Sequence, residues 1–380
     1  MKFKKILILV STLYFSFGTS WADNIKIGFN VPLTGFAAAD GESALNGAKL
    51  AVQQANNAGG VNGRQIELVV YDDQASPKEA VPIANRLIEK DGVKVAVSGS
   101  YSGPTRAAAG TFQSAGIPYI SAYAIHPDIT RAGNYVFRTS FMGEVQGRAG
   151  ALLIGQTMQH RRVVVITLKN DFGKSLAAGF KAEAANFGIK IVNEYEYSIS
   201  DRQFGPIVAK VRADKPDAIY ASGYFFTAGP LVSQLRSGGV NAPVIGQEGY
   251  DGEQFIKIAG ASAEGVIITT SLDRDSNSPE ARSFISEYEK FSGNKVDMVS
   301  ASTHTAIKVV VAALRKSGTK SPDAIRKAIS QTKLLAATGQ ISFNKLGEVR
   351  KNVEVQIVRD GDWHYHSTIR DQTLLAPPNF

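Results

Sequence analysis

Glu248 is an isolated carboxylate in an apolar part of the sequence. It lies in VIGQEGYDGEQF (244–255), where a run typical of a buried strand meets a turn, and glycines stand close on both sides. Enclosing a charged side chain costs free energy unless a partner of opposite charge or a hydrogen-bond donor meets it. The segment therefore raises the question of what Glu248 faces.

The motifs for nucleotide binding and hydrolysis are incomplete. GKS (173–175) matches the end of a phosphate loop, but Leu168 stands where the first glycine of that motif would be, so the backbone cradle is missing. In GSYSG (99–103), Tyr101 occupies the position of the hydrolase nucleophile. The chain has no cysteine for thiol chemistry. We therefore expect no enzyme and no cofactor.

The five histidines do not form a clear metal or catalytic motif. His364 and His366 would share one face of a strand, but no third metal ligand is near, and a solvent-facing strand is the simpler interpretation. His304 follows Ser302 and is the nearest approach to a serine–histidine pair. An exported α/β hydrolase is thus the alternative of another class, and no metal is expected.

The first 22 residues have the composition of a cleaved signal peptide. Three lysines precede an apolar stretch that is too short to span a bilayer, and Ser20-Trp21-Ala22 fits a cleavage site. We expect cleavage after Ala22 and a periplasmic protein. Because the leader contains three lysines and no acid, the net charge of +8 falls to +5. With no dense Lys/Arg block, that charge gives little support to a nucleic-acid partner.

Short β-branched runs alternate with longer segments of helical period, which predicts βαβ units on parallel sheets. Strands are predicted at 25–33, 66–72, 93–99, 117–123, 162–168, 190–197, 218–223, 242–247 and 265–271. Helices are predicted at 42–58, 77–90, 104–115, 144–158, 173–187, 204–213, 227–238, 279–292, 302–317 and 322–332.

This alternation forms two blocks, 25–135 and 161–270, and so predicts two α/β lobes joined by more than one crossing strand. The segments 137–144 and 269–280 are interpreted as connectors between them. Hairpins are expected near the C-terminus, with turns at 345–347 and 360–362.

Residues suited to ligand binding recur where the predicted strands end. Ligands of open parallel sheets bind beyond the carboxyl ends of the strands, near helix N-termini. Hydroxyls, glycines, aromatic rings and one acid occupy these positions at 34–36, 100–103, 123–125, 171–173, 223–226 and 248–250. Such loops would line an apolar cleft that holds a few placed polar groups.

Three segments resemble the periplasmic Leu/Ile/Val-binding proteins of ABC transporters. They are NAGGVNGRQIELVVYDDQASPKEAVPIANRLI (57–88), GIPYISAYAIHPDIT (116–130) and DFGKSLAAGF (171–180), and the resemblance covers essentially the whole mature chain. It implies a type I periplasmic binding protein, with two doubly wound parallel-sheet lobes that are joined by three hinge strands and close on a ligand. Its implied boundaries are a signal peptide at 1–22, lobe one at 23–140 plus 273–350, and lobe two at 141–272 plus 351–380.

The resemblance also implies roles for single residues. Ser102 matches the family serine that binds the ligand α-carboxylate, and its place before a predicted helix supplies free N–H groups. Glu248 matches the acid that pairs with the ligand ammonium, with the same spacing from Tyr224, which matches a tyrosine that covers the ligand. Phe172 stands where the family often has a tyrosine that flanks the ligand.

Two departures from the family pattern bear on the ligand. Tyr123-Ala124-Ile125 replaces the usual Ala-Ala-Thr loop, so one hydroxyl is lost while a backbone N–H remains. Asp40 replaces a common aromatic residue, and we expect it to cap helix 42–58 rather than face the cleft. Tyr123 and Tyr250 add bulk that would shrink the pocket or stack on a planar ligand.

Together these features predict the solute-binding protein of an ABC importer, acting as a monomer with permease subunits as partners. The expected ligand is a small hydrophobic amino acid, branched-chain or aromatic. An aromatic carboxylate, a small amide or urea is the alternative. The expected ligand-binding residues are Tyr101, Ser102, Tyr123, Ile125, Phe172, Tyr224, Glu248 and Tyr250.

Overall fold

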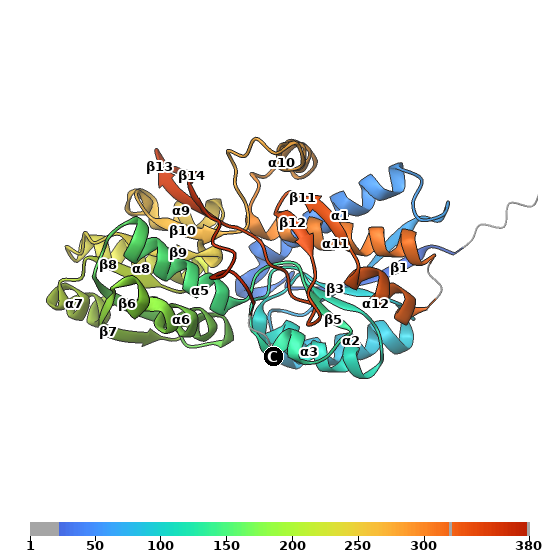
Figure 1. Ribbon diagram of the computed structural model, residues 1–380, viewed down its shortest axis with the longest axis horizontal. Coiled ribbons are helices and arrows are strands. Elements are labelled where there is room, and N and C mark those ends of the chain that lie inside the picture. The colour runs from blue at the N-terminus through green and yellow to red at the C-terminus, as the bar shows by residue number, and fades with distance from the viewer. Residues whose placement is uncertain (1–22, 319–320, 378–380) are drawn as a thin grey trace, which may run out of the picture.

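The computed structural model describes residues 23–318 and 321–377, and the predicted signal peptide lies outside them. The first lobe is built on a five-stranded parallel sheet in the order β2-β1-β3-β4-β5, seen on the right of Figure 1. Its strands are β2 (Ile66–Asp72), β1 (Ile25–Val31), β3 (Ala96–Ser98), β4 (Tyr119–Ser121) and β5 (Val136–Arg138). Strand β5 lies partly in the segment 137–144, which was predicted to be a connector. This strand was not predicted because three residues are too few to show the alternating pattern of a strand.

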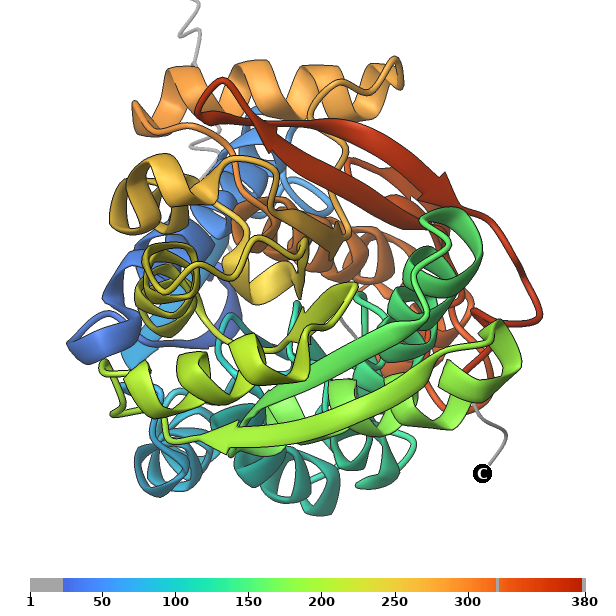
Figure 2. The same ribbon diagram turned by 90° about the vertical axis from the view of Figure 1, so that its left-hand side faces the viewer.

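The second lobe is built on a seven-stranded sheet in the order β14-β13-β10-β9-β8-β6-β7. All its neighbours are parallel except at one edge, where β13 pairs antiparallel with β10 and with β14. Figure 2 shows this hairpin at the edge of the sheet opposite β6 and β7. The strands are β14 (Asp362–Ile369), β13 (Val353–Arg359), β10 (Ile267–Thr270), β9 (Val244–Gln247), β8 (Ala218–Ala221), β6 (Arg162–Leu168) and β7 (Lys190–Tyr197). A separate hairpin joins β11 (Lys333–Ala336) to β12 (Gly339–Ser342).

Helices connect the strands in both lobes, which confirms the predicted α/β alternation. In the first lobe they are α1 (Ala38–Asn57), α2 (Pro77–Asn85), α3 (Ser102–Ser114), α4 (Asp128–Arg131), α10 (Pro279–Ser292), α11 (Met298–Ser317) and α12 (Pro322–Ser330). In the second they are α5 (Gly143–Leu152), α6 (Asp171–Ala184), α7 (Gly205–Asp214), α8 (Phe225–Ser237) and α9 (Glu253–Ala259). Among the described helices, none is both long and apolar enough to cross a membrane.

Two helices begin four residues earlier than predicted, and both differences matter for the cleft. Helix α11 starts at Met298 because Asp297 caps it, accepting a hydrogen bond from the Ser300 backbone N–H at 2.7 Å. Helix α1 starts at Ala38, so the expectation that Asp40 caps this helix is wrong. Asp40 lies inside the first turn instead, and its side chain is free to bond elsewhere.

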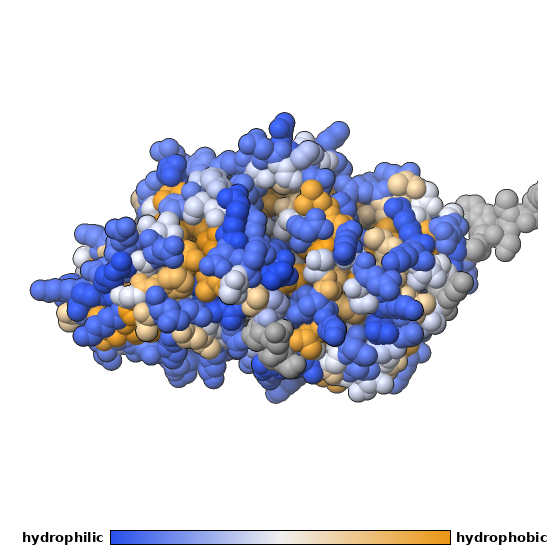
Figure 3. Space-filling model, viewed as in Figure 1, coloured by the Kyte–Doolittle hydropathy of each residue, from blue (hydrophilic) through white to orange (hydrophobic). Residues whose placement is uncertain are grey.

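The central strands are buried on both faces, as expected for parallel sheets covered by helices. In β1 every residue but one is buried, and in β6 all but the first are. The outer surface is mainly hydrophilic on the face shown in Figure 3, where apolar side chains are scattered. Burial of apolar strand surface therefore stabilises both lobes.

The described chain passes three times between the two sheets: after β5, after β10 and before β13. Arg138, at the end of β5, forms a bidentate ion pair with Glu348 before the third crossing, with distances of 2.9 and 3.1 Å. Both side chains are fully buried. Arg138 also donates to the carbonyl oxygens of Ala124 and His126, at 3.0 and 2.9 Å. One guanidinium thus joins the first and third crossings to the loop after β4.

We expect Arg138→Met to lower the free energy of unfolding by about 3–5 kcal/mol, because Glu348 would be left as a buried charge without its cation. Urea unfolding followed by circular dichroism measures this. The double variant Arg138→Met, Glu348→Leu should recover much of the loss. Lys181→Met is the matched control, since the pair between Lys181 and Glu194 is exposed and should contribute less than about 1 kcal/mol. Equal losses of unfolding free energy in Arg138→Met and Lys181→Met would contradict the stabilising role assigned to the buried pair.

Candidate functional site

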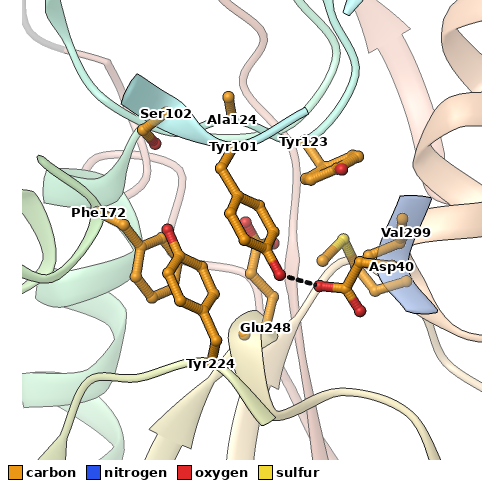
Figure 4. A pocket seen from close by; sticks show the side chains of 11 residues that line it. Asp40, Tyr101, Ser102, Tyr123, Ala124, Phe172, Tyr224, Glu248 and Val299 are labelled. Carbon is orange, nitrogen blue, oxygen red and sulfur yellow. Dashed lines mark hydrogen bonds between the residues drawn. The ribbon is translucent and has the colours of Figure 1, made fainter. Parts of the chain in front are cut away.

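A cavity that is partly open to solvent lies between the two lobes (Figure 4). The first lobe lines it with Asp40, Tyr101, Ser102, Tyr123, Ala124, Met298 and Val299, and the second lobe with Phe172, Tyr224, Glu248 and Gly249. Six of the eight residues expected to bind a ligand are in this lining, while Ile125 and Tyr250 are not. Residues distant in the sequence thus meet because strand ends of both sheets face one space.

Glu248 projects into this cavity from the short 3-10 turn that follows β9 (Figure 4). Its side chain is enclosed, with the residue only 2% exposed, and neither carboxylate oxygen has a hydrogen-bond partner among the described residues. Burial raises the pKa of Glu248 to about 8, although the positive charge of Lys351 opposes that rise. A donor or cation placed in the cavity would therefore find an unused acceptor.

Close packing of glycines fixes the turn that carries Glu248. A β-carbon on Gly249 would come within 2.2 Å of the carbonyl oxygen of Gly223, so a larger residue would displace the turn. Tyr250 does not form the expected wall of the cavity. It is fully buried inside the second lobe, with its ring centroid 5.0 Å from that of Phe255.

Ser102 lies at the opposite wall, as the first residue of α3. The first backbone N–H groups of a helix have no partner within the helix and carry a partial positive charge, so this end suits a carboxylate. The Ile125 backbone N–H donates to Ser102 Oγ at 3.2 Å, which orients the hydroxyl oxygen while leaving its hydrogen available. Ile125 contributes through this bond, since it is buried and is not among the residues that line the cavity.

Three aromatic rings stack across the boundary between the lobes. Tyr101 of the first lobe lies on Tyr224 of the second, with centroids 4.1 Å apart and planes 6° apart. Phe172 lies against Tyr224 with centroids 4.8 Å apart. Tyr123 is tied to its own lobe, because its hydroxyl donates to the Gly99 carbonyl oxygen at 2.7 Å. The rings form an apolar wall beside the polar groups.

Asp40 also lines the cavity, contrary to the expectation that it caps a helix. The Tyr101 hydroxyl donates to Asp40 Oδ2 at 2.6 Å, the bond that is dashed in Figure 4. Burial raises the pKa of Asp40 to about 7, against the effect of this hydrogen bond. Met298 and Val299 were missed because α11 was predicted to begin only at residue 302. For Asp40, the departure from the family's aromatic residue was the available signal.

His304 does not form the serine–histidine pair that a hydrolase would require. The His304 Nε2 atom lies 2.7 Å from Gln54 Oε1, and its ring packs against Phe284. Ser302 Oγ instead donates to the sulfur of Met298. Within the described ranges, no group of three or more His, Asp or Glu residues is placed to hold a metal ion.

Known proteins resemble this chain along most of its length. Residues 24–361 match the model of the family described as "Periplasmic binding protein". The leucine-, isoleucine-, valine-, threonine-, and alanine-binding protein of Pseudomonas aeruginosa is 29% identical over 350 residues, which cover 91% of this chain and 92% of that protein.

Solved structures share the fold. LivJ, the substrate-binding protein of a branched-chain amino acid transporter from Streptococcus pneumoniae, in complex with isoleucine, superposes with a TM-score of 0.86 at 27% identity, covering 91% of this chain and 99% of that one. An ABC transporter solute-binding protein from Rhodopseudomonas palustris, in complex with 3,4-dihydroxybenzoic acid, gives 0.85 at 25% identity, with coverages of 93% and 99%. This chain therefore belongs to the periplasmic binding protein family and has its type I fold, two doubly wound lobes joined by three crossings.

Proposed function

We propose that this protein is the solute-binding component of an ABC importer and captures a small amino acid between its lobes in the periplasm. The observation that carries the proposal is the enclosed carboxylate of Glu248, without a partner among the described residues, facing the same cavity as the N-terminus of α3. An amino acid is the simplest molecule that has a cation to pair with Glu248 and an anion to bind at the N-terminus of α3. The amino-acid-binding names of the relatives support the same class.

In this proposal each lobe binds a different part of the ligand. The α-carboxylate accepts hydrogen bonds from the Ser102 hydroxyl and the first N–H groups of α3 in the first lobe. The ammonium group pairs with Glu248 in the second lobe, and the rings of Tyr101, Tyr123, Phe172 and Tyr224 exclude water. Because neither lobe alone satisfies both charges, the ligand favours the closed arrangement.

Several further parts of the proposal concern the whole protein. Lobe one comprises 23–140 plus 273–350 and lobe two 141–272 plus 351–380, so that residues near 140, 273 and 351 absorb the closing motion. The protein acts as a monomer, and the permease subunits of the importer are its partners. A solute bound in a cleft and released unchanged requires no catalysis.

An aromatic carboxylate is the second candidate ligand, and a small amide or urea would share its lack of an ammonium group. The stacked tyrosines would suit a planar acid, and the relative that binds 3,4-dihydroxybenzoic acid supports this reading. The charges of the lining oppose it, because the cavity has two carboxylates, Asp40 and Glu248, and no lysine or arginine among its lining residues. An anion without an ammonium group would bring no cation to Glu248, whose pKa would then stay raised by burial.

A thermal-shift screen of the wild-type protein separates the two candidates. We expect amino acids to raise the melting temperature, and benzoate, 3,4-dihydroxybenzoate, acetamide and urea to leave it unchanged. Ligands that bind only the folded state stabilise it in proportion to the logarithm of their concentration, so a rise that grows with concentration identifies binding. A rise with ammonium-free compounds alone would contradict the proposal.

Glu248→Gln keeps the size of the side chain but removes its charge. We expect affinity for the amino acids found in the screen to fall by two to three decades, because an enclosed ammonium without its counter-ion costs roughly 3–5 kcal/mol. Isothermal titration calorimetry measures this loss. Glu253→Gln, at a partly exposed acid that pairs with Lys257, is the control and should bind as the wild type does. Equal affinity in the two variants would refute the role of Glu248.

Binding of an amino acid should release a proton from Glu248. Burial raises the pKa of this acid to about 8, so it is largely protonated at pH 7, and a bound ammonium would lower that pKa. Affinity should therefore increase from about pH 6 to pH 8 and then level off. Calorimetry in buffers of different ionisation enthalpy counts the protons, and Glu248→Gln should release about one proton fewer at pH 7. An equal count in both proteins would exclude the linkage.

A further inference from the structure

Asp40 is a second acid on the wall of the cavity, and it comes from the lobe opposite Glu248. The residue is 9% exposed, and its Oδ2 atom accepts the hydrogen bond from Tyr101. No donor within the described residues reaches its Oδ1 atom, because the bond from Tyr101 is the only one formed to this carboxylate there. Tyr101 thus occupies one of the two oxygens of this carboxylate and leaves the other without a protein donor among the described residues.

Asp40 lies at the end of the cavity away from Ser102. Figure 4 shows the two on either side of the Tyr101 ring, with Glu248 rising between them from the other lobe. Val299 lies beside Asp40 in Figure 4, and Met298, the residue before it, also lines the cavity. An amino acid with its carboxylate at Ser102 and its ammonium at Glu248 would therefore direct its side chain past apolar groups toward Asp40.

The charges that act most strongly on Asp40 are negative, although Lys257 and Lys295 line a second, more polar pocket that Asp40 also borders. Asp297 and Asp251 are the charged groups that act on it, and each is already satisfied by the protein. Asp297 accepts from Ser43 and Ser300, and Asp251 is paired with Arg274. No basic residue lines the cavity. A donor for the remaining oxygen of Asp40 is therefore supplied best by the ligand.

We propose that Asp40 makes the site selective for amino acids whose side chain ends in a hydrogen-bond donor, namely a hydroxyl, an amide N–H or an amine. This inference rests on the proposed function, and it replaces the expected hydrophobic side chain by one that is apolar along its length and polar at its end. A purely apolar side chain of the same shape would bury the Oδ1 atom of Asp40 without a partner, which disfavours binding.

Isosteric pairs of amino acids test this selectivity. Threonine has nearly the shape of valine, and asparagine that of leucine, so each pair differs mainly in polarity. By titration calorimetry, the wild-type protein should bind the polar member of at least one pair about ten-fold or more tightly, as expected when a buried acceptor would otherwise lose its partner. Tighter binding of the apolar member in both pairs would overturn the inference.

Two variants separate selectivity from a merely structural role of Asp40. Asp40→Asn can still accept from Tyr101 but replaces the free oxygen by an amide nitrogen, so the preference for the polar member should disappear. Tyr101→Phe keeps Asp40 and should retain the preference, even if both affinities change. If Asp40→Asn leaves the ratio unchanged, Asp40 only positions Tyr101 and the inference fails.

The outcomes distinguish this inference from the proposed function. Tight binding of valine and leucine, with no preference for threonine or asparagine, would overturn the role of Asp40 and leave amino-acid capture intact. If no amino acid binds the wild-type protein, both fail. Melting temperatures without ligand show whether each variant is folded. If Asp40→Asn does not fold, the inference is tested by the ratio of affinities for the polar and the apolar amino acid of each pair, measured in the wild type and in Tyr101→Phe.

Discussion

The free-energy cost of enclosing a carboxylate governs how this protein is organised. Several other buried charges have partners among the described residues: Arg138 with Glu348, Arg274 with Asp251, and Asp73 with Asn30 and Ser100. These pairs hold the crossings and loops in place, and each avoids the penalty of several kcal/mol for a lone buried ion. Glu248 differs, because the described protein provides no hydrogen bond to it. In the proposed function, its requirement for a partner would give the cleft chemical selectivity.

The regular elements could be predicted well where local signals and periodicity agree. The strands at 66–72, 162–168 and 190–197 and the helix at 279–292 have the predicted bounds. The starts of α1 and α11 were missed, because the cap of α1 is an alanine and the capping aspartate of α11 precedes a segment rich in small and β-branched residues. The same two misses hid Asp40, Met298 and Val299, which join the cavity only through these early turns.

The side chains that line the cavity are determined by three-dimensional contacts, which cannot be predicted from the spacing of residues in the sequence. Strand ends identified the loops of Tyr101, Phe172, Tyr224 and Glu248, and family resemblance supplied their expected roles. The bond from Tyr101 to Asp40 joins residues 61 positions apart, and the direction of the Tyr250 side chain depends on packing inside the second lobe. Loop residues can thus be nominated from sequence, whereas the direction of each side chain requires the fold.

The stack of Tyr101 on Tyr224 joins the lobes through the protein's own side chains. Such a pair contributes about 0.5–1.5 kcal/mol, so some attraction toward the shut form exists in the empty protein. Shutting over an uncompensated Glu248 works against it and costs more. The two contributions together would leave the empty protein biased toward opening. In the proposed role, a transporter that recognises only the shut shape would therefore seldom engage the protein when no solute is bound.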